Sequence, residues 1–295
     1  MNSPISLENS ESVALLNPEL YAHFAVPFQT GDLRSHALFC LQISNPLEKT
    51  IAVQALWDSL QAQRVCINSA VLPVVDLSKA LPGRPEKPEL VPPLAVKRRA
   101  MNSVEGRSAL LHALAHIEFN AINLALDAVW RFNGMPEAYY HDWMQVAKEE
   151  AYHFSLLVQH LQQFAYEYGA FSAHNSLWEL AERTQEDVLA RMALVPRTME
   201  ARGLDACPAL RAKLAQAGDM GAAAILDVIL RDEIGHVGIG NTWFAYLCEQ
   251  RQREPIATYA ELAEQFRAPQ MRGPFNIDAR KAAGFTQAEL DVLLA

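Results

Sequence analysis

The chain has few cysteines, no unbroken apolar run of membrane length and no basic leader. Its four cysteines, Cys40, Cys66, Cys207 and Cys248, are scattered without a Cys-x-x-Cys pair. This argues against a disulfide framework and favours a reducing compartment. No unbroken apolar run reaches the roughly 18 residues that a membrane helix needs, and the polar start MNSPISLENSES does not resemble a signal peptide. We therefore expect a cytoplasmic protein without membrane attachment.

Positive charge is also scarce. The 25 Lys and Arg residues face 34 Asp and Glu residues, which gives a net charge of −9. Such a balance argues against a broad surface for nucleic acid or anionic lipid. One basic run, Lys97-Arg98-Arg99, is most simply a solvated approach to a helix. The hydrophobic content of 51% in 295 residues is enough for a large core.

The chain contains two Glu-x-x-His motifs, each preceded by a glutamate at nearly the same distance. The residues are Glu118, Glu150 and His153 in the first copy, and Glu200, Glu233 and His236 in the second. The upstream glutamate stands 32 residues before the first motif and 33 before the second. One such motif is close to chance, but a matched pair is not. The repeat predicts that four helices present six metal ligands to a common interior, as in four-helix carboxylate proteins.

Apolar periodicity supports helices around three of these positions. The first helix is expected over 107–132 and carries Glu118 within an apolar stripe. The second is expected over 136–169, from a proline at the first turn to a terminal glycine. The fourth is expected to begin near Asp219. A carboxylate within an apolar stripe is unfavourable unless it has a partner. The expected fold is therefore all-α, a ferritin-like four-helix bundle with helical extensions.

The third helix is the least regular part of the pattern. It is expected from about Asn175 to Gly203, with a kink or break at Pro196. A short connecting helix is expected over 207–218. Repeat spacing favours Glu200 as the ligand from this region, and four acids of the same stretch remain open as rivals. These rivals are Glu179, Glu182, Glu186 and Asp187.

The types of the six candidate ligands indicate which metals the site would bind. Residues three apart share a helix face, so each motif offers one carboxylate and one imidazole to the same ion. Four carboxylates with two imidazoles suit iron or manganese, and the set is too rich in oxygen for a structural zinc site. We therefore expect two metal ions, with iron favoured and manganese or a mixed pair as alternatives. The ligand positions left open would serve dioxygen activation or ferrous oxidation.

Several further polar residues near the motifs have two interpretations. Glu149 and Asp232 either accept the second imidazole N–H of a ligand histidine or are salt-bridged on the helix flank. His112 and His116 are expected to be hydrogen-bonded structural residues, and His174 a loop or capping residue.

The remaining segments predict the domain organisation. Residues 1–100 are expected as a lead-in packed on the bundle, 101–252 as the bundle, and 253–295 as a helical tail. Within the lead-in, a helix is expected from Asn45 to about Gln61, followed by an extended proline-rich segment over 81–93. Strand-like alternation is confined to short stretches such as 71–77. The tail is expected to hold helices over 259–266 and from Thr286.

Five runs of this sequence resemble an uncharacterised ferritin-like family called domain of unknown function 455. They are PGRPEKPEL, EGRSALLHALAHIE, KEEAYHF, RMALVPRTMEARGLD and RDEIGHVGIGNTWF. The resemblance extends from about residue 35 to the C-terminal AGF segment. It implies a ferritin-like bundle and a dinuclear metal site at the six residues above. More distantly, the chain resembles di-iron hydroxylases that modify transfer RNA.

Three functions are compatible with these observations, and we rank them in order. The first is a di-iron oxidoreductase or oxygenase that acts on an unknown small or macromolecular substrate with an electron-donor protein. The second is a ferroxidase or iron-handling protein, and the third is a non-catalytic helical module stabilised by metal. No membrane partner is expected, and a nucleic acid is disfavoured although transfer RNA stays open. A homodimer is the default oligomeric state.

Overall fold

The chain folds into helices joined by loops. The computed structural model describes residues 22–24, 27–68, 70–97 and 99–295, and no strand occurs in these ranges. The expected all-α fold is confirmed. The chain divides into two compact units, Met1–His174 and Asn175–Ala295, which are described separately below. The expected division near residues 100 and 252 remains a prediction.

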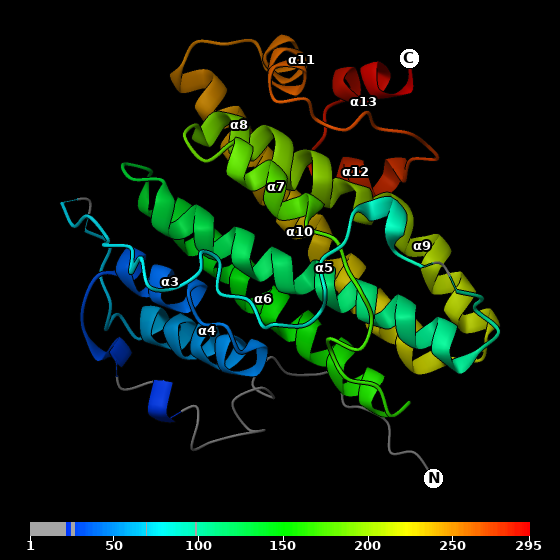
Figure 1. Cartoon of the computed structure of the whole chain (residues 1–295). Helices are drawn as coiled ribbons and strands as arrows, with labels where there is room; N and C mark the ends of the chain where they lie inside the picture. Colours follow the sequence, from blue (N-terminus) through cyan, green and yellow to red (C-terminus); the bar gives the residue numbers. More distant parts are fainter. Residues whose placement is uncertain (1–21, 25–26, 69, 98) are drawn as a thin grey trace. The chain divides into compact units, whose positions relative to one another are not determined.

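The described residues of the first unit form α-helices and short 3₁₀ turns. Its elements are η1 (Pro27–Gln29), α3 (Leu33–Leu41), α4 (Pro46–Gln61), η2 (Pro93–Ala95), α5 (Val104–Arg131) and α6 (Glu137–Gln162). Helices α5 and α6 lie side by side (Figure 1), and α3 packs against α5 while α4 packs against α6. Helices α3 and α4 therefore pack on the helix pair that carries the first set of candidate ligands.

Local sequence explains where these helices begin. Helix α4 starts at the expected place because the Asn45 side chain accepts hydrogen bonds from two backbone N–H groups of its first turn. Helix α5 starts at Val104, three residues earlier than expected, because Ser103 caps it by accepting from the backbone N–H of Gly106. Near its end, Asp127 is buried and pairs with Arg131 at 2.6 Å.

The expectation that the second helix continues to Gly169 is wrong. Helix α6 ends at Gln162, and the chain turns through Ala165, which has a positive φ of 58°. The segment that follows is held by other contacts. The backbone N–H of Gly169 donates to His112 Nε2 at 2.9 Å, and Ala173 exchanges backbone hydrogen bonds with residues 89 and 91. The helical pattern of the sequence stops short of this glycine because tertiary hydrogen bonds fix a loop there.

The proline-rich segment is extended, as expected, with no helix from residue 81 to 92. The stretch 71–77 forms no strand and exposes Leu72, Val74 and Leu77 by 75%, 88% and 92%. Strand-like alternation in this stretch therefore reflects an exposed loop and no element of a sheet.

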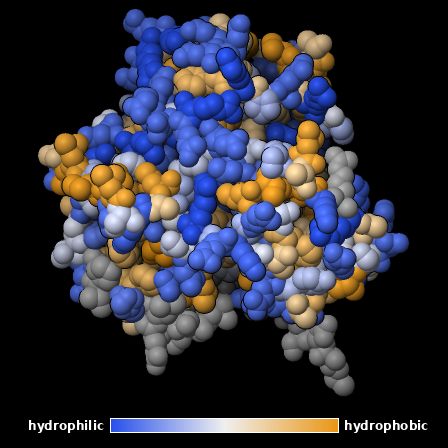
Figure 2. All heavy atoms as spheres, viewed as in Figure 1, coloured by the Kyte–Doolittle hydropathy of each residue, from blue (hydrophilic) through white to orange (hydrophobic). Residues whose placement is uncertain are grey.

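On the face shown in Figure 2, hydrophobic residues lie in separate patches among hydrophilic ones.

The first unit encloses a lysine. Lys49 is fully buried, and its Nζ atom donates to the carbonyl oxygens of Leu41 and Gly83 at 3.1 and 2.9 Å and to the Asn123 side chain. Burial lowers the pKa of Lys49 well below its ordinary value. This residue ties α4 to α5 and to the proline-rich segment by polar contacts inside the core.

The second unit contains seven α-helices and one π-helical turn. Its elements are α7 (Ser176–Arg183), α8 (Val188–Leu194), η3 (Val195–Glu200), α9 (Ala201–Gln216), α10 (Met220–Gln250), α11 (Pro255–Gln265), α12 (Ile277–Ala282) and α13 (Gln287–Leu294). Helix α10 packs against α8, η3 and α9. It begins near the expected residue because Asp219 caps it by accepting from the backbone N–H of Ala222 at 3.0 Å.

The structure divides the expected third helix into four elements, α7, α8, η3 and α9. A turn separates α7 from α8, and Pro196 lies in the π-helical turn η3, since its missing N–H interrupts the regular hydrogen-bond ladder. The predicted interruption at Pro196 is confirmed. The predicted end at Gly203 is wrong, because α9 continues through it to Gln216 and absorbs the expected connecting helix.

Helix α10 approaches the π-helical turn closely at Gly240. A Cβ placed on Gly240 would lie 2.6 Å from Cβ and 2.8 Å from Cγ of Pro196. Only glycine permits this approach, because a proline ring cannot move aside as a flexible side chain does. The packing of η3 on α10 therefore depends on a glycine opposite a proline.

The tail forms three helices. Helix α11 runs from Pro255 to Gln265, so it starts four residues before the predicted 259–266 and ends one residue before the predicted end. Helix α13 begins after Thr286 as expected, with a capping box in which the Thr286 and Glu289 side chains each bond to the other's backbone N–H. Helix α12 was not expected from the sequence. It is anchored by Arg280, which pairs with Asp205 of α9 at 2.6 Å.

Helix α5 is long and apolar enough to cross a membrane by length and composition alone. Within its most apolar window, however, 72% of the residues are buried inside the protein. The buried core helix of a soluble protein passes the same test, so composition is weak evidence for a membrane span. The cytoplasmic location remains a prediction.

Candidate metal centre

Four buried side chains are of a type that could hold a metal ion. They are Glu118, Glu150, His153 and Glu233, and each can offer one ligand atom. The first three belong to the first unit and the fourth to the second. The six residues expected from the sequence are therefore described unit by unit.

Helix α5 contributes Glu118. This carboxylate lies in the middle of the helix, where the neighbouring residues Phe119 and Ile122 are also buried. Its Oε2 atom is shielded from solvent and has no hydrogen-bond partner. Leaving a buried acceptor unsatisfied is unfavourable by about 1–3 kcal/mol, and more for a charged group. The Glu118 carboxylate would therefore be stabilised by a bound cation or by a proton.

Helix α6 contributes Glu150 and His153, both of which are fully buried. Their spacing of three residues places them on one face of the helix. The His153 Nδ1 atom lies 3.4 Å from Glu118 Oε2 and 3.5 Å from Glu150 Oε2. The ligand atoms of the three residues lie within 4.8 Å of one another. One imidazole nitrogen thus faces two carboxylate oxygens from two helices.

These separations suit a common metal ion. Donor atoms that each lie about 2.1 Å from an ion are separated by about 3 Å at right angles and about 4 Å across the ion. The two distances from His153 fall between these values. Two carboxylates with one imidazole form a hard, oxygen-rich donor set that suits iron or manganese. The residues of the first unit therefore fit a metal ion.

The electrostatics of this cluster also favour a cation. Burial raises the pKa of Glu118 well above its ordinary value, and the negative charge of Glu150 raises it further. The contact with His153 acts in the opposite direction without cancelling these effects. A divalent ion between the two carboxylates would reverse this balance, because it stabilises both in the charged form.

The second unit holds the other three expected ligands. Glu233 and His236 lie on α10 at the same spacing as in α6, both buried, with His236 Nδ1 3.8 Å from Glu233 Oε1. Glu200 is the last residue of η3, and its Oε2 atom is shielded from solvent. The six-residue ligand set itself remains a prediction.

The rival acids of the third helix have other surroundings. Glu179, Glu182 and Glu186 are exposed, and the Glu182 carboxylate accepts from the Trp178 indole at 2.7 Å. Asp187 caps α8 by accepting from the backbone N–H of Leu189, and it pairs with Arg251 at 2.9 Å. These contacts favour Glu200 over the rivals as the ligand of this region.

The polar residues that flank the motifs form ordinary helix contacts. Glu149 accepts from the Gln145 side chain at 3.1 Å, and Asp232 pairs with Arg231 at 2.8 Å. The salt-bridged interpretation therefore holds for Asp232, and a role for either residue behind a ligand histidine remains a prediction.

The two histidines of α5 are structural, as expected. His112 accepts the Gly169 N–H, while His116 hydrogen-bonds the Tyr168 hydroxyl at 2.8 Å and the backbone oxygen of His174 at 3.1 Å. Burial lowers the pKa of both histidines to about 4. They are therefore neutral at pH 7 and fasten the loop after α6 to α5.

The chain is similar to one family along most of its length. The model of the family described as "Protein of unknown function (DUF455)" matches residues 42–291. A protein from Haemophilus influenzae, described as uncharacterized, is 48% identical over 258 residues, which cover 85% of this chain and 90% of that protein. No solved structure matches the chain. All six candidate ligands lie within the matched residues.

Proposed function

We propose that this chain, which belongs to the DUF455 family, is a metal-dependent oxidoreductase that uses dioxygen at a dinuclear non-haem site. The observation that carries the proposal is the cluster of the first unit, where His153 Nδ1 faces two buried carboxylates at 3.4 and 3.5 Å. A buried Glu118 oxygen without a hydrogen-bond partner adds to it. Buried charges in proteins are paired with a counter-charge or coordinate a metal ion.

The second unit is proposed to supply the rest of the site. Glu233 and His236 repeat the motif of α6, and Glu200 takes the place that Glu118 holds before it. Four carboxylates then balance two divalent ions, and the two imidazoles bind one ion each. The four helical segments would form a ferritin-like bundle around the metals. The matched spacing and the shared burial of the two motifs support this arrangement.

Iron is the metal we favour, with manganese or a mixed pair as alternatives, because the donors are carboxylates and imidazoles. When bound, a reduced di-iron centre supplies the electrons and the open coordination positions for reaction with dioxygen. The six residues hold the metals and take no proton themselves. Hydroxylation of a substrate by dioxygen consumes two electrons and two protons and releases one water, so an external electron donor is required.

One feature of the first unit favours an oxygenase over a ferritin-type store. Helices α3 and α4 pack against α5 and α6. They cover faces of the helix pair that a cage assembly would use for contacts between subunits. Ferrous oxidation without an organic substrate is therefore the second candidate.

The test is dioxygen consumption by protein loaded with ferrous iron under anaerobic conditions. We expect rapid uptake by the wild type, uptake near the background rate for Glu150→Gln, and wild-type uptake for Glu137→Gln, whose carboxylate is exposed at the start of the same helix. Uptake by Glu150→Gln at the wild-type rate, at equal folded content, would overturn the proposal. A large hollow oligomer in gel filtration would favour the iron-storage alternative.

A further inference from the structure

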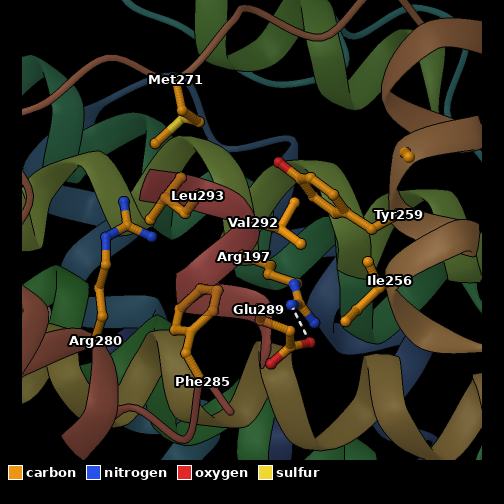
Figure 3. A pocket seen from close by; sticks show the side chains of 10 residues that line it. Arg197, Ile256, Tyr259, Met271, Arg280, Phe285, Glu289, Val292 and Leu293 are labelled. Atoms are coloured by element: carbon orange, nitrogen blue, oxygen red, sulfur yellow. Dashed lines mark hydrogen bonds and ion pairs between the residues drawn. The ribbon is translucent and has the colours of Figure 1, made fainter. Parts of the chain in front are cut away.

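The second unit contains an apolar pocket remote in chain position from the Glu-x-x-His motifs (Figure 3). Its volume is about 180 Å³. Helix α11 supplies Ile256, Tyr259 and Ala260 to the wall, and α13 supplies Glu289, Val292 and Leu293. Two arginines, Arg197 of η3 and Arg280 of α12, complete the lining together with Phe285 and Met271. The pocket thus combines hydrophobic side chains with two guanidinium groups.

Arg197 has more hydrogen-bond donors than acceptors to receive them. Its guanidinium carries five N–H bonds, yet among the described residues its hydrogen bonding is limited to Nη2 and Glu289 Oε1. Its Nε atom is buried and has no hydrogen-bond partner. The residue is 6% exposed, and its charge lies over the rings of Phe244, Tyr259 and Phe285 at 4.6, 5.4 and 5.0 Å. A donor buried in this way requires an explanation.

The two carboxylates beside the pocket, Glu289 and Asp205, already accept hydrogen bonds from protein groups. Glu289 Oε2 accepts the backbone N–H and hydroxyl of Thr286 at 2.8 and 2.9 Å, and its Oε1 accepts from Arg197. Asp205 accepts from Arg280 through both oxygens, at 3.0 and 2.6 Å, and also from the backbone N–H of Asn276 at 2.9 Å. Around the pocket, the carboxylates therefore already accept hydrogen bonds, whereas Arg197 has N–H groups left to donate.

We propose that this pocket binds a small carboxylate with an apolar body, such as a ring or a short branched chain. The carboxylate accepts from Arg197, while the apolar body lies against Ile256, Phe285 and Leu293. An apolar cavity of about 150 Å³ holds benzene, so a volume of about 180 Å³ suits a ligand of about nine non-hydrogen atoms. Charge-assisted hydrogen bonds from a guanidinium make the carboxylate the favoured acceptor.

No residue of the pocket is one of the six candidate metal ligands, but Arg197 lies in η3 three residues before Glu200. Binding is therefore measured both on protein with metal and on protein without it, so that an effect of the metal site is told apart from an effect of the pocket. The probe is benzoate, and two molecules of nearly the same size serve as comparisons. Benzyl alcohol keeps an acceptor without the charge, and benzylamine reverses the charge.

Binding is measured by ligand-observed NMR and isothermal titration on the full chain. For benzoate we expect saturable binding with a Kd on the order of 1 mM or tighter. Benzyl alcohol should bind at least tenfold more weakly, and benzylamine should not bind. Ala260→Trp should abolish benzoate binding, since it places an indole at the wall of the pocket. The matched control is Ala257→Trp, at an exposed position of the same helix outside the lining.

Two further variants keep the test decisive. If Ala260→Trp does not fold, Val292→Trp blocks the pocket from α13, where Val292 is 60% exposed. Arg197→Lys keeps a positive charge beside Glu289 but removes the fork of N–H groups, so benzoate binding should weaken at least tenfold. No benzoate binding, binding unaffected by both blocking variants, or equal affinity for benzyl alcohol would each overturn the proposal.

Discussion

The two units carry the same Glu-x-x-His motif but support it differently. In the first unit, α5 and α6 are long unbroken helices, and they bring Glu118, Glu150 and His153 within 4.8 Å of one another. In the second, α10 is equally regular, but Glu200 ends a π-helical turn next to Pro196. Regular helices place ligands by periodicity alone, whereas the π-helical turn places Glu200 through its packing on α10.

The comparison first predicts that removal of one ligand from either unit prevents the binding of both metal ions. Glu118→Gln in the first unit and Glu233→Gln in the second should each lower the metal content from two ions per chain to less than about one-fifth of that. Both remove a carboxylate that is proposed to neutralise the shared pair of ions. Metal per chain after anaerobic ferrous loading is the measurement.

Glu137→Gln and Glu186→Gln, at exposed positions of the first and second units, serve as controls and should bind metal like the wild type. If Glu233→Gln kept one full ion while Glu118→Gln lost it, the two units would hold separate sites.

The second prediction concerns the sign of a stability change in the first unit. In metal-free protein, Glu118→Gln should raise the free energy of unfolding by about 1–4 kcal/mol, because it removes a buried carboxylate beside Glu150. In metal-loaded protein the same variant should be less stable than the wild type, since it loses metal binding. Thermal unfolding in both states measures this reversal. A loss of stability in the metal-free state would show that Glu118 is satisfied without metal.

The third prediction addresses the close packing of the π-helical turn in the second unit. Gly240→Ala should destabilise metal-free protein by about 1–3 kcal/mol, because the added methyl meets the Pro196 ring at 2.6 Å. It should also lower metal content by displacing the turn that ends at Glu200. Gly203→Ala is the control, since a Cβ there meets nothing within 4 Å, and it should stabilise α9 by about 0.5–1 kcal/mol. Equal effects of the two substitutions in urea denaturation would contradict this packing.

The smallest predicted effect is a pH dependence in the core of the first unit. Because the folded-state pKa of Lys49 lies below its unfolded value of 10.5, the unfolded chain binds more protons between the two values. The stability contribution of Lys49 is therefore greatest above pH 10.5, falls as the pH drops from 10.5 to the folded-state pKa, and is constant below it. Relative to Lys49→Met, the metal-free wild type should gain stability as the pH rises from the folded-state pKa of Lys49 toward 10.5. A difference that stays constant with pH would contradict the lowered pKa.

The sequence predicted those parts of the structure that follow from helical periodicity and capping. The helices expected around Glu118, from near Asp219 and from Thr286 are present. The burial of Glu118, Glu150 and His153 followed from the apolar stripes that contain them.

Features that depend on contacts distant in sequence could not be predicted. The loop that follows α6 is held by the hydrogen bond from Gly169 to His112, 57 residues away. The continuation of α9 past Gly203 depends on its packing with α10 and α12. Arg197 and Arg280 carry no sequence signal, because their role arises only when α11 and α13 form the walls of one pocket.

The central claim is that the two motifs together hold two metal ions. Elemental analysis of the wild-type protein tests it most directly, on protein expressed with adequate iron and manganese and purified without chelator. We expect two ions per chain, as iron, manganese or a mixed pair. A metal content near zero that anaerobic ferrous loading does not restore would contradict the account and leave the helical module without a metal as the better description.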